Sequence, residues 1–267
     1  MGSARSPASA VEADLVAHVS RLYGSSGQVH DEPDAVWLLT GDDSPHRNGV
    51  LRAVVPAGEE DSTVERLLAP FDRLGLPMMW WVFAPPERRP DVVDLALRAR
   101  GFELDADLPG MAVELASLST VTAPGTGVIR RVLDEASFAE WSWVVGRAFG
   151  DPAFEGGPSA AAFRALGFAE DAPFRHFVCR ADGAPVGAST LSLGAGVAGL
   201  ANIAVVPECR GRGVGAAVAS AALVEGRGLG LRLGVLSAGE QGVSLYRRLG
   251  FREVSRHRTY VRRASAS

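Results

Sequence analysis

"VVPECRGRGVGAAVASAAL", residues 205–223, is the stretch of sequence that decides the fold. An apolar segment typical of a strand ends at Val206, and an alanine-rich segment typical of a helix begins near Val214. Glycines and arginines fill the interval between them. Glycine lets the backbone come close to a ligand, and the amides at the start of a helix attract anions. The stretch therefore predicts a strand, an anion-binding turn and a helix, in that order.

Two familiar phosphate-binding motifs fit this stretch poorly. A Walker A loop requires a lysine on the phosphates, and this chain has none, because all 27 of its basic residues are arginines. A dinucleotide fingerprint stays open, since Gly211, Gly213 and Ala216 have the GxGxxA spacing. The following strand, however, ends in Ser237 and Ala238 instead of the acid that would bind a ribose. An NAD-dependent oxidoreductase is therefore the weaker hypothesis.

The arginines beside the glycines favour a bound anion. A glycine-rich turn without a ligand would explain the glycines, but it would give no reason for Arg210 and Arg212. Read as Arg210-x-x-Gly213-x-Gly215, the stretch combines open backbone amides, a helix dipole and arginines that can donate to phosphates. The prediction is a cradle for a pyrophosphate.

The composition is that of a globular protein without a membrane segment. The chain has 267 residues, of which 47% are hydrophobic, so it can form one large domain or two small ones around a core. No apolar run reaches the roughly 18 residues of a membrane span, and residues 1–10 lack the apolar core of a signal peptide. We expect a cytoplasmic protein with no membrane partner.

The distribution of charge and the two cysteines indicate which classes of ligand the chain binds. Acids outnumber arginines before residue 125, whereas arginines outnumber acids after it. The arginines of the second half are scattered and have no interleaved aromatic stripe, which argues against nucleic acid and favours a small phosphorylated ligand. Cys179 and Cys209 lack the spacing and the histidine neighbours of a zinc site, so no metal is expected.

A segment rich in Ser, Thr, Gly and Pro, residues 116–127, is typical of a domain boundary. We therefore predict an N-terminal domain over residues 1–115, a linker over 116–127 and a C-terminal domain over 128–267. Hydrophobic periodicity predicts helices and strands in both domains. The expected helices are residues 11–24, 62–74, 90–100, 134–149, 159–168, 214–225 and 244–250. The expected strands are residues 35–40, 49–55, 78–83, 110–115, 127–132, 174–180, 185–193, 198–206, 231–237 and 251–263.

Short turn and capping signals refine these elements. An Asp182-Gly183 turn and a second turn over residues 194–196 join three strands, which predicts an antiparallel meander. Ser62 and Glu65 have the spacing of a capping box, which predicts that a helix opens at Ser62.

The C-terminal half resembles the GNAT superfamily of acyl-CoA-dependent N-acyltransferases. The family's R/Q-x-x-G-x-G/A motif matches Arg210, Gly213 and Gly215, and "SLYRRLGF", residues 244–251, matches its L-Y-x-x-x-G-F element. The order of expected elements over residues 127–263 also agrees. The N-terminal half shares the order strand, helix, Gly-Phe and strand but lacks the glycine motif. It therefore resembles a degenerate second copy that binds no CoA.

The resemblance implies a mixed α/β fold of two GNAT-like halves, each a mostly antiparallel sheet with flanking helices. It implies an acetyl-CoA-dependent N-acetyltransferase that acts on a small-molecule or peptide amine, as a monomer or homodimer. Coenzyme A would lie across a splay between the strands over residues 200–206 and 231–236. The implied cofactor-binding residues are Ile203, Ala204, Val205, Arg210, Gly211, Arg212, Gly213, Val214, Gly215 and Ser237.

Direct attack of the amine on the thioester is also implied by the resemblance. A backbone amide near Val205 would stabilise the oxyanion, and Tyr246 stands where the family often keeps the general acid for the departing thiolate. Tyr246 as a core residue of its helix is the competing interpretation. The strand before the glycines offers Asn202 and no acid. Proton removal is left open between a neutral amine and water paths to His176, Glu208 or Glu240.

The acceptor pocket of the family usually involves the first two helices of the catalytic half. Those helices and the segment between them carry the aromatic residues Trp141, Trp143, Phe149, Phe154 and Phe163. Such aromatic residues are more often part of a core. Gly239 departs from the Asn that often helps to hold the cofactor, and Ser237 is the expected substitute. Because the strand carboxylate is missing, a CoA-binding or regulatory module without turnover is the alternative to an enzyme.

Overall fold

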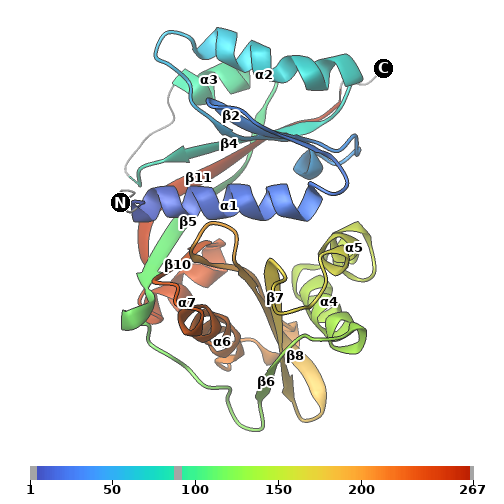
Figure 1. The fold of residues 1–267 in the computed structure, drawn as a ribbon, viewed down its shortest axis with the longest axis vertical. Helices are drawn as coiled ribbons and strands as arrows, with labels where there is room; N and C mark the ends of the chain where they lie inside the picture. The colour runs from blue at the N-terminus through green and yellow to red at the C-terminus, as the bar shows by residue number, and fades with distance from the viewer. Residues whose placement is uncertain (1–4, 87–91, 265–267) are drawn as a thin grey trace. The chain divides into compact units, whose positions relative to one another are not determined.

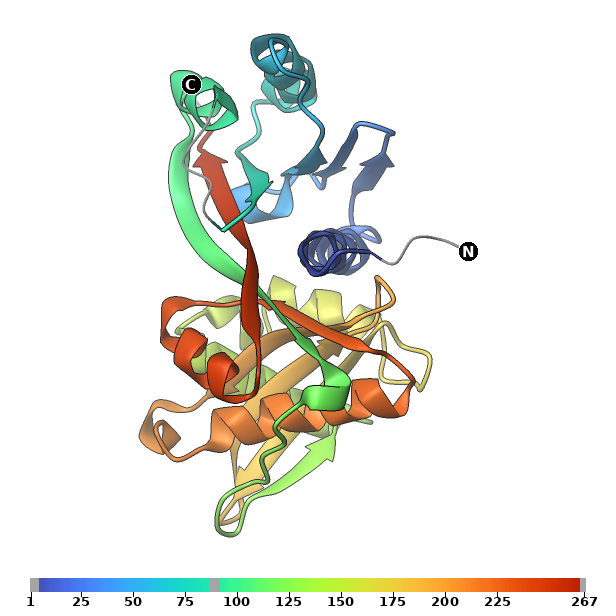
Figure 2. The same ribbon diagram turned by 90° about the vertical axis from the view of Figure 1, so that its left-hand side faces the viewer.

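The computed structural model describes residues 5–86 and 92–264, and the chain separates into two compact units. Unit 1 comprises residues 1–18 and 111–253, and unit 2 comprises residues 19–110 and 254–267. Helix α1 (Pro7–Tyr23) and strands β5 (Glu103–Glu114) and β11 (Arg252–Arg262) therefore contribute residues to both units. Figure 2 shows β5 and β11 as long neighbouring strands.

These units differ from the predicted division into residues 1–115, 116–127 and 128–267. The predicted linker belongs to unit 1, where Leu118 is buried and the amide of Val121 donates to Ser220 Oγ at 2.9 Å. The change of unit falls inside β5, because the apolar end of that strand packs in the core of unit 1. Turn-forming residues alone do not reveal that strand β5 contributes to both units.

Unit 1 contains a mixed sheet with the strand order β5-β10-β9-β8-β7-β6. Neighbouring strands from β6 to β9 are antiparallel, whereas β9 and β10 are parallel. The predicted meander is thus confirmed, and its turn has positive φ at Asp182 (49°) and Gly183 (81°), as a type I′ hairpin requires. The strands are β6 (Val128–Arg131), β7 (Phe174–Ala181), β8 (Ala184–Ser192), β9 (Ala198–Val205) and β10 (Leu233–Ser237).

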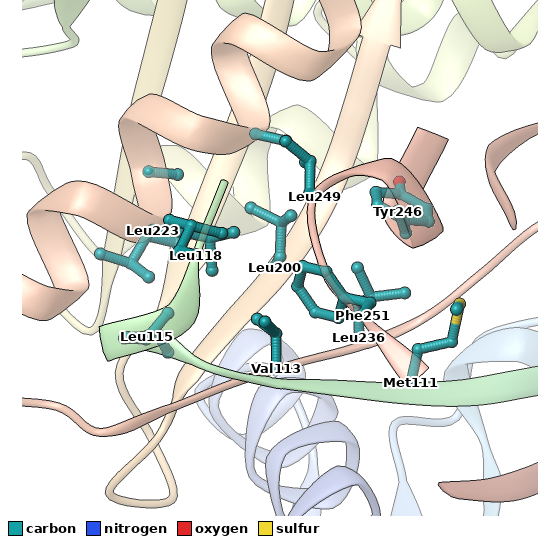
Figure 3. Packing of buried hydrophobic residues seen from close by; sticks show 14 of the residues in the cluster. Met111, Val113, Leu115, Leu118, Leu200, Leu223, Leu236, Tyr246, Leu249 and Phe251 are labelled. Atoms are coloured by element: carbon teal, nitrogen blue, oxygen red, sulfur yellow. The ribbon is translucent and has the colours of Figure 1, made fainter. Parts of the chain in front are cut away.

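Helices cover both faces of this sheet (Figure 1). Helices α4 (Glu135–Phe149) and α5 (Pro158–Ala165) lie on one face, and α6 (Val214–Gly228) and α7 (Val243–Arg248) lie on the other. The main core fills the space under α6 and α7 (Figure 3). It includes Leu223 of α6, Leu200 of β9, and Met111 and Val113 of β5, all less than a tenth exposed.

Unit 2 has the strand order β1-β2-β3-β4-β11-β5 and carries helices α2 (Glu60–Leu74) and α3 (Val92–Ala99). Its other strands are β1 (Gln28–Asp31), β2 (Ala35–Leu39), β3 (Gly49–Ala53) and β4 (Met78–Ala84). Each unit thus has a parallel strand-helix-strand crossover, β3-α2-β4 and β9-α6-β10, beside antiparallel strands. This repetition agrees with two similar halves, and the predicted mixed α/β fold is confirmed.

One local prediction needs correction, and one strand was missed. The helix that the capping box would open at Ser62 begins at Glu60 instead, after Glu59 and without a side-chain capping bond. The acids of its first turn favour this earlier start, because they interact well with the helix dipole. Strand β1 has no counterpart in the sequence pattern, since its four residues are mostly polar and it pairs only along the edge, with β2.

Candidate active site

Strands β9 and β10 are paired at their starts and separate beyond them. Among the described residues, the register joins Gly234 with Ala198 and Val235 with Gly199, and it extends no further. The edge of β9 that faces β10 is therefore unpaired from Leu200 to Val205. An unpaired strand edge of this kind can bind an extended ligand through main-chain hydrogen bonds. The strands separate in the region where the resemblance implied a splay.

A bulge interrupts β9 beside this opening. Ala201 pairs with Thr190 and Ala204 pairs with Ala188, so Asn202 and the residue after it face a single residue of β8. Asn202 has φ of 51°, in the left-handed region that asparagine tolerates better than most residues. The bulge displaces backbone groups of the strand from the regular ladder. The signal in the sequence was an asparagine within an apolar strand.

The glycine-rich turn follows β9 and leads into α6. Gly211 and Gly213 have φ of 75° and 86°, which strongly favours glycine at both positions. The first helical bond runs from the amide of Ala217 to the carbonyl of Gly213 at 3.1 Å. The amides at the start of α6 therefore have no acceptor within the helix. A Cβ added at Gly215 would lie 3.1 Å from Leu245 Cδ1, so the backbone there is closely packed.

The two arginines of the turn have different surroundings. Arg210 donates from Nη2 to the carbonyl of Ala148 at 2.7 Å and from Nε to the carbonyl of Val205 at 3.3 Å. Its side chain therefore braces the turn against the end of α4 and the end of β9. Arg212 is exposed. The guanidinium of Arg212 is thus the more accessible of the two for an incoming anion.

Tyr246 lies in the core beside the end of the sheet. The side chain is 8% exposed, and its ring packs edge-to-face on Phe251 with the centroids 5.9 Å apart (Figure 3). Burial raises the pKa of the Tyr246 hydroxyl to about 12. The phenol therefore keeps its proton throughout the neutral range. The structure thus places Tyr246 in the core, as the competing interpretation expected, in a form that can donate a hydrogen bond.

His176 of β7 lies on the face of the sheet that α6 does not cover. Its Nδ1 is 2.9 Å from Thr190 Oγ1, and that oxygen is 3.4 Å from Asn202 Nδ2. Burial, and secondarily the nearby His18, lowers the pKa of His176 to about 3. The imidazole is neutral at pH 7 and takes up a proton poorly. This makes His176 a weak candidate for a general base.

Aromatic side chains surround His176. Its ring centroid is 4.2 Å from that of Trp141 on α4 and 5.2 Å from that of Phe163 on α5, and both aromatic residues are buried. Phe154 packs on Trp141 at 6.1 Å. Trp143 and Phe149 are instead 44% and 56% exposed. Of the aromatic residues implied for the acceptor region, Trp141 and Phe163 therefore pack against His176, Phe154 packs against those two rings, and the other two lie on the surface.

The remaining predicted bases are exposed. Glu208 forms an ion pair with Arg147 at 2.7 Å, and its side chain is 60% exposed. Glu240 is exposed in the turn after β10. Ser237 lies at the end of β10, close to the opening between the strands. Proton removal at the opening between β9 and β10 requires an acid close to β9, and neither glutamate is buried against that strand.

Asp14 of α1 is a buried acid that the sequence analysis missed. It is 4% exposed, and a Cβ added at Gly199 of β9 would collide with its carboxylate. A signal was present, because Val11, Asp14 and His18 recur at helical spacing, which puts an acid on the apolar face of the helix. His18 packs on Phe174 with the centroids 4.7 Å apart, and burial lowers its pKa to about 4.

Other classes of site find no support in the described ranges. Within residues 5–86 and 92–264, no group of three His, Cys, Asp or Glu side chains is arranged to hold a metal ion. Both cysteines are unpaired thiols, Cys179 buried and Cys209 partly so. Of the described helices, none combines the length and the apolar character that crossing a membrane requires.

Unit 2 has a similar crossover with a different turn. Here β3 and β4 pair only at Gly49 with Met79 and at Val50 with Trp80. The helix that follows β3 begins with Glu60 and carries no glycine motif. The first turn of α2 carries the acids Glu60 and Asp61. Their negative charges would repel a phosphate group at the start of this helix.

Comparisons with known proteins bear on the family and the fold. The acetyltransferase (GNAT) family model matches residues 138–251. No curated protein matches the chain. A GCN5-related N-acetyltransferase from Kribbella flavida superimposes with a TM-score of 0.71 at 20% identity, covering 94% of this chain and 95% of that one. A GCN5-related N-acetyltransferase from Sphaerobacter thermophilus gives 0.64 at 18% identity, covering 99% and 95%.

A third solved structure has a tandem arrangement. It is described as a tandem GNAT protein from the clavulanic acid biosynthesis pathway, and it gives a TM-score of 0.65 at 14% identity, covering 98% of this chain and 96% of that one. At such low identities these likenesses establish the fold alone. The resemblance found in the glycine motif is thus supported over residues 138–251 by the acetyltransferase (GNAT) family model, and the fold is that of GCN5-related N-acetyltransferases.

Proposed function

We propose that the chain is an N-acetyltransferase that transfers the acetyl group of acetyl-CoA to a primary amine at unit 1. The observation that carries this proposal is the opening between β9 and β10, which leads to the uncapped start of α6. Coenzyme A combines an extended arm with a diphosphate. An unpaired strand edge suits the arm, and a row of open amides suits the diphosphate.

The residues of this chain fit such a ligand. Main-chain groups of Ile203, Ala204 and Val205 would bind the arm along β9. The amides from Gly211 to Gly215 would bind the diphosphate, with Arg212 adding charge and Ser237 a hydroxyl at the end of β10. Arg210 would contribute by holding the turn in place, since its guanidinium donates to two backbone carbonyls. A side chain at Gly215 would crowd the start of α6, because an added Cβ lies 3.1 Å from Leu245 Cδ1 and 3.4 Å from Val205 Cγ2.

Acetyl-CoA supplies an acetyl group activated as a thioester. A backbone amide at the bulge of β9 would donate to the carbonyl oxygen and stabilise the negative charge that develops there as the amine attacks. Tyr246 would donate a hydrogen bond to the departing sulfur. Its pKa of about 12 lies above the reference value of ~8.5 for a thiol, so we assign the hydroxyl a stabilising hydrogen bond more than a complete proton transfer.

The acceptor is proposed to be a small-molecule or peptide amine, bound by a cytoplasmic monomer or homodimer. The aromatic residues around His176 lie on the face of the sheet opposite α6, and they would line the acceptor side of the reaction. One observation favours a second candidate, a CoA-binding module without turnover. Strand β9 contains no acid of its own to take the proton from the amine.

Incubation of the purified chain with acetyl-CoA and a panel of amines tests the proposal. We expect release of free thiol together with a product whose mass exceeds that of the amine by one acetyl group. Tight binding of CoA without thiol release across the panel would favour the module without turnover. Absence of CoA binding would contradict both candidates.

A further inference from the structure

We propose that Asp14 is the general base that removes the proton from the amine acceptor, an inference that rests on the proposed acetyl transfer. Strand β9 has no acid, but residues 7–18 of α1 belong to unit 1 and bring one to it. The Asp14 carboxylate packs against the backbone of Gly199, where a side chain on the strand would otherwise be. The helix thus supplies what the strand lacks.

The position along β9 is the first argument. Gly199 pairs with Val235, and this is the last pair before β9 and β10 separate. The carboxylate therefore lies at the apex of the opening. The glycine turn lies at the other end of β9, six residues or about 20 Å away at roughly 3.3 Å per residue. A ligand with its diphosphate on the turn and its arm along β9 directs its reactive end toward Asp14.

The face of the sheet is the second argument. Gly199 lies opposite Ser192 on β8, and Thr190 of the same strand bonds to His176. Ser189, the residue before Thr190 on β8, donates to the carbonyl of Val218 on α6 at 2.8 Å, so it points to the other face. Asp14 therefore shares the face of His176 and the aromatic residues. An amine bound there would meet the carboxylate and the thioester together.

The surroundings of the other acids are the third argument. Among the described residues, Asp14 and Asp94 are the acids less than a tenth exposed, and Asp94 belongs to unit 2. Glu225 and Glu140, which form ion pairs with Arg175 and Arg180, have side chains that are 33% and 31% exposed. Asp14 is thus the buried carboxylate of unit 1.

The proton balance of the step is complete. The carboxylate of Asp14 takes one proton from the ammonium group, directly or through one water, and leaves a lone pair on nitrogen. A carbon–nitrogen bond forms at the thioester carbonyl, and the carbon–sulfur bond then breaks. The nitrogen loses a second proton, which ends on the sulfur, where Tyr246 has donated its hydrogen bond. Asp14 finally releases its proton to water.

The variant Asp14→Asn tests this assignment without changing the size of the side chain. We expect kcat to fall about 10²-fold or more, while the Kd for CoA changes less than twofold. With acceptors whose amino group is already neutral at the assay pH, the fall in kcat should be much smaller. Loss of structure alone would lower kcat equally for both kinds of acceptor. Glu12→Gln, the same change of charge in the same helix, is the matched control and should keep the parent rate.

A binding experiment supplies a readout that needs no turnover. Calorimetry of a protonated amine with the complex of the chain and CoA should show at least fivefold weaker binding in Asp14→Asn and parent affinity in Glu12→Gln. If the parent binds the amine but shows no acetyl transfer, the proposed function fails, and this titration still shows whether Asp14 interacts with the amine. Equal amine binding and equal kcat in Asp14→Asn and the parent would overturn the inference.

Relocating the acid is the sharpest variant. Gly199 does not have a positive φ, and the three atoms nearest to an added Cβ all belong to the carboxyl group of Asp14, so Asp14→Ala removes these three clashes. We expect Asp14→Ala combined with Gly199→Asp to recover at least tenfold in kcat over Asp14→Ala alone. This pair also decides the case if Asp14→Asn fails to fold, as judged by its melting curve. A folded double variant with no recovery would contradict the placement of the base.

Discussion

At the scale of residues, His176 and His18 make the fold of unit 1 sensitive to acid. Burial lowers the pKa of His176 to about 3 and that of His18 to about 4, from an ordinary value of 6.5. Between pH 6.5 and those values the unfolded chain binds protons that the folded chain does not. The free energy of unfolding therefore falls as the pH falls through this window. Each histidine contributes up to about 1.4 kcal/mol per pH unit.

Replacing His176 with Asn should make the stability less dependent on pH. The amide of Asn can keep a hydrogen bond to Thr190 but does not titrate. We expect the slope of unfolding free energy against pH, measured by urea denaturation between pH 6.5 and 5, to become shallower by roughly 1 kcal/mol per unit. An unchanged slope would show that His176 does not carry the lowered pKa.

Tyr246→Phe separates catalysis from packing at the same scale. The ring contact with Phe251 is kept, so the melting temperature should change little. If the hydroxyl stabilises the departing sulfur, kcat should fall about 10²-fold while the Kd for CoA is maintained. Steady-state rates and calorimetry measure the two quantities. A variant with the parent kcat would leave Tyr246 as a core residue only.

At the scale of elements, the bulge in β9 depends on a residue that accepts a positive φ. Asn202 has φ of 51°, which costs a β-branched residue roughly 1–2 kcal/mol. We expect Asn202→Val to lower the free energy of unfolding by about that amount, and Asn202→Gly to cost less. Urea denaturation at pH 7 measures both. Equal effects of valine and glycine would show that the bulge is not held by backbone conformation.

Regular elements were the part of the fold that the sequence could predict. Hydrophobic periodicity predicted helices that correspond to α1, α4 and α6, and turn residues predicted the meander of unit 1. Local signals of this kind act within a few residues. The bulge at Asn202 and the contact of Asp14 with Gly199 depend on pairing between distant segments. The sequence offered only indirect signals of them, an asparagine in an apolar strand and an acid on the apolar face of a helix, and neither signal predicts the pairing. Part of the candidate site, the glycine turn, was visible because its chemistry is local.

At the scale of the whole molecule, the core of unit 1 depends on residues that lie before the predicted linker, because strand β5 belongs to both units. The core of unit 1 takes Met111, Val113 and Leu115 from before the predicted linker. Losing a buried side chain of this size costs about 2–5 kcal/mol each, which together rivals the 5–15 kcal/mol stability of a typical domain. A division at the turn-rich segment therefore removes part of the core.

Fragments test this dependence. We expect residues 128–267 alone to show no cooperative thermal transition by circular dichroism. A fragment of residues 108–267, which keeps the three core residues, should be measurably more ordered and melt at a higher temperature. If both fragments unfold alike, the end of β5 does not contribute to the core of unit 1 as the structure indicates.

The central claim is that the open amides between Arg210 and Gly215 bind the diphosphate of coenzyme A. Calorimetric titration with CoA is the most direct measurement, made on the parent chain, on Gly215→Val and on Gly228→Val. Gly228 lies at the far end of α6, where an added Cβ meets nothing within 4 Å. The account predicts binding to the parent, at least tenfold weaker binding to Gly215→Val, and unchanged binding to Gly228→Val. Absence of binding to the parent, or equal affinity for Gly215→Val, would contradict it.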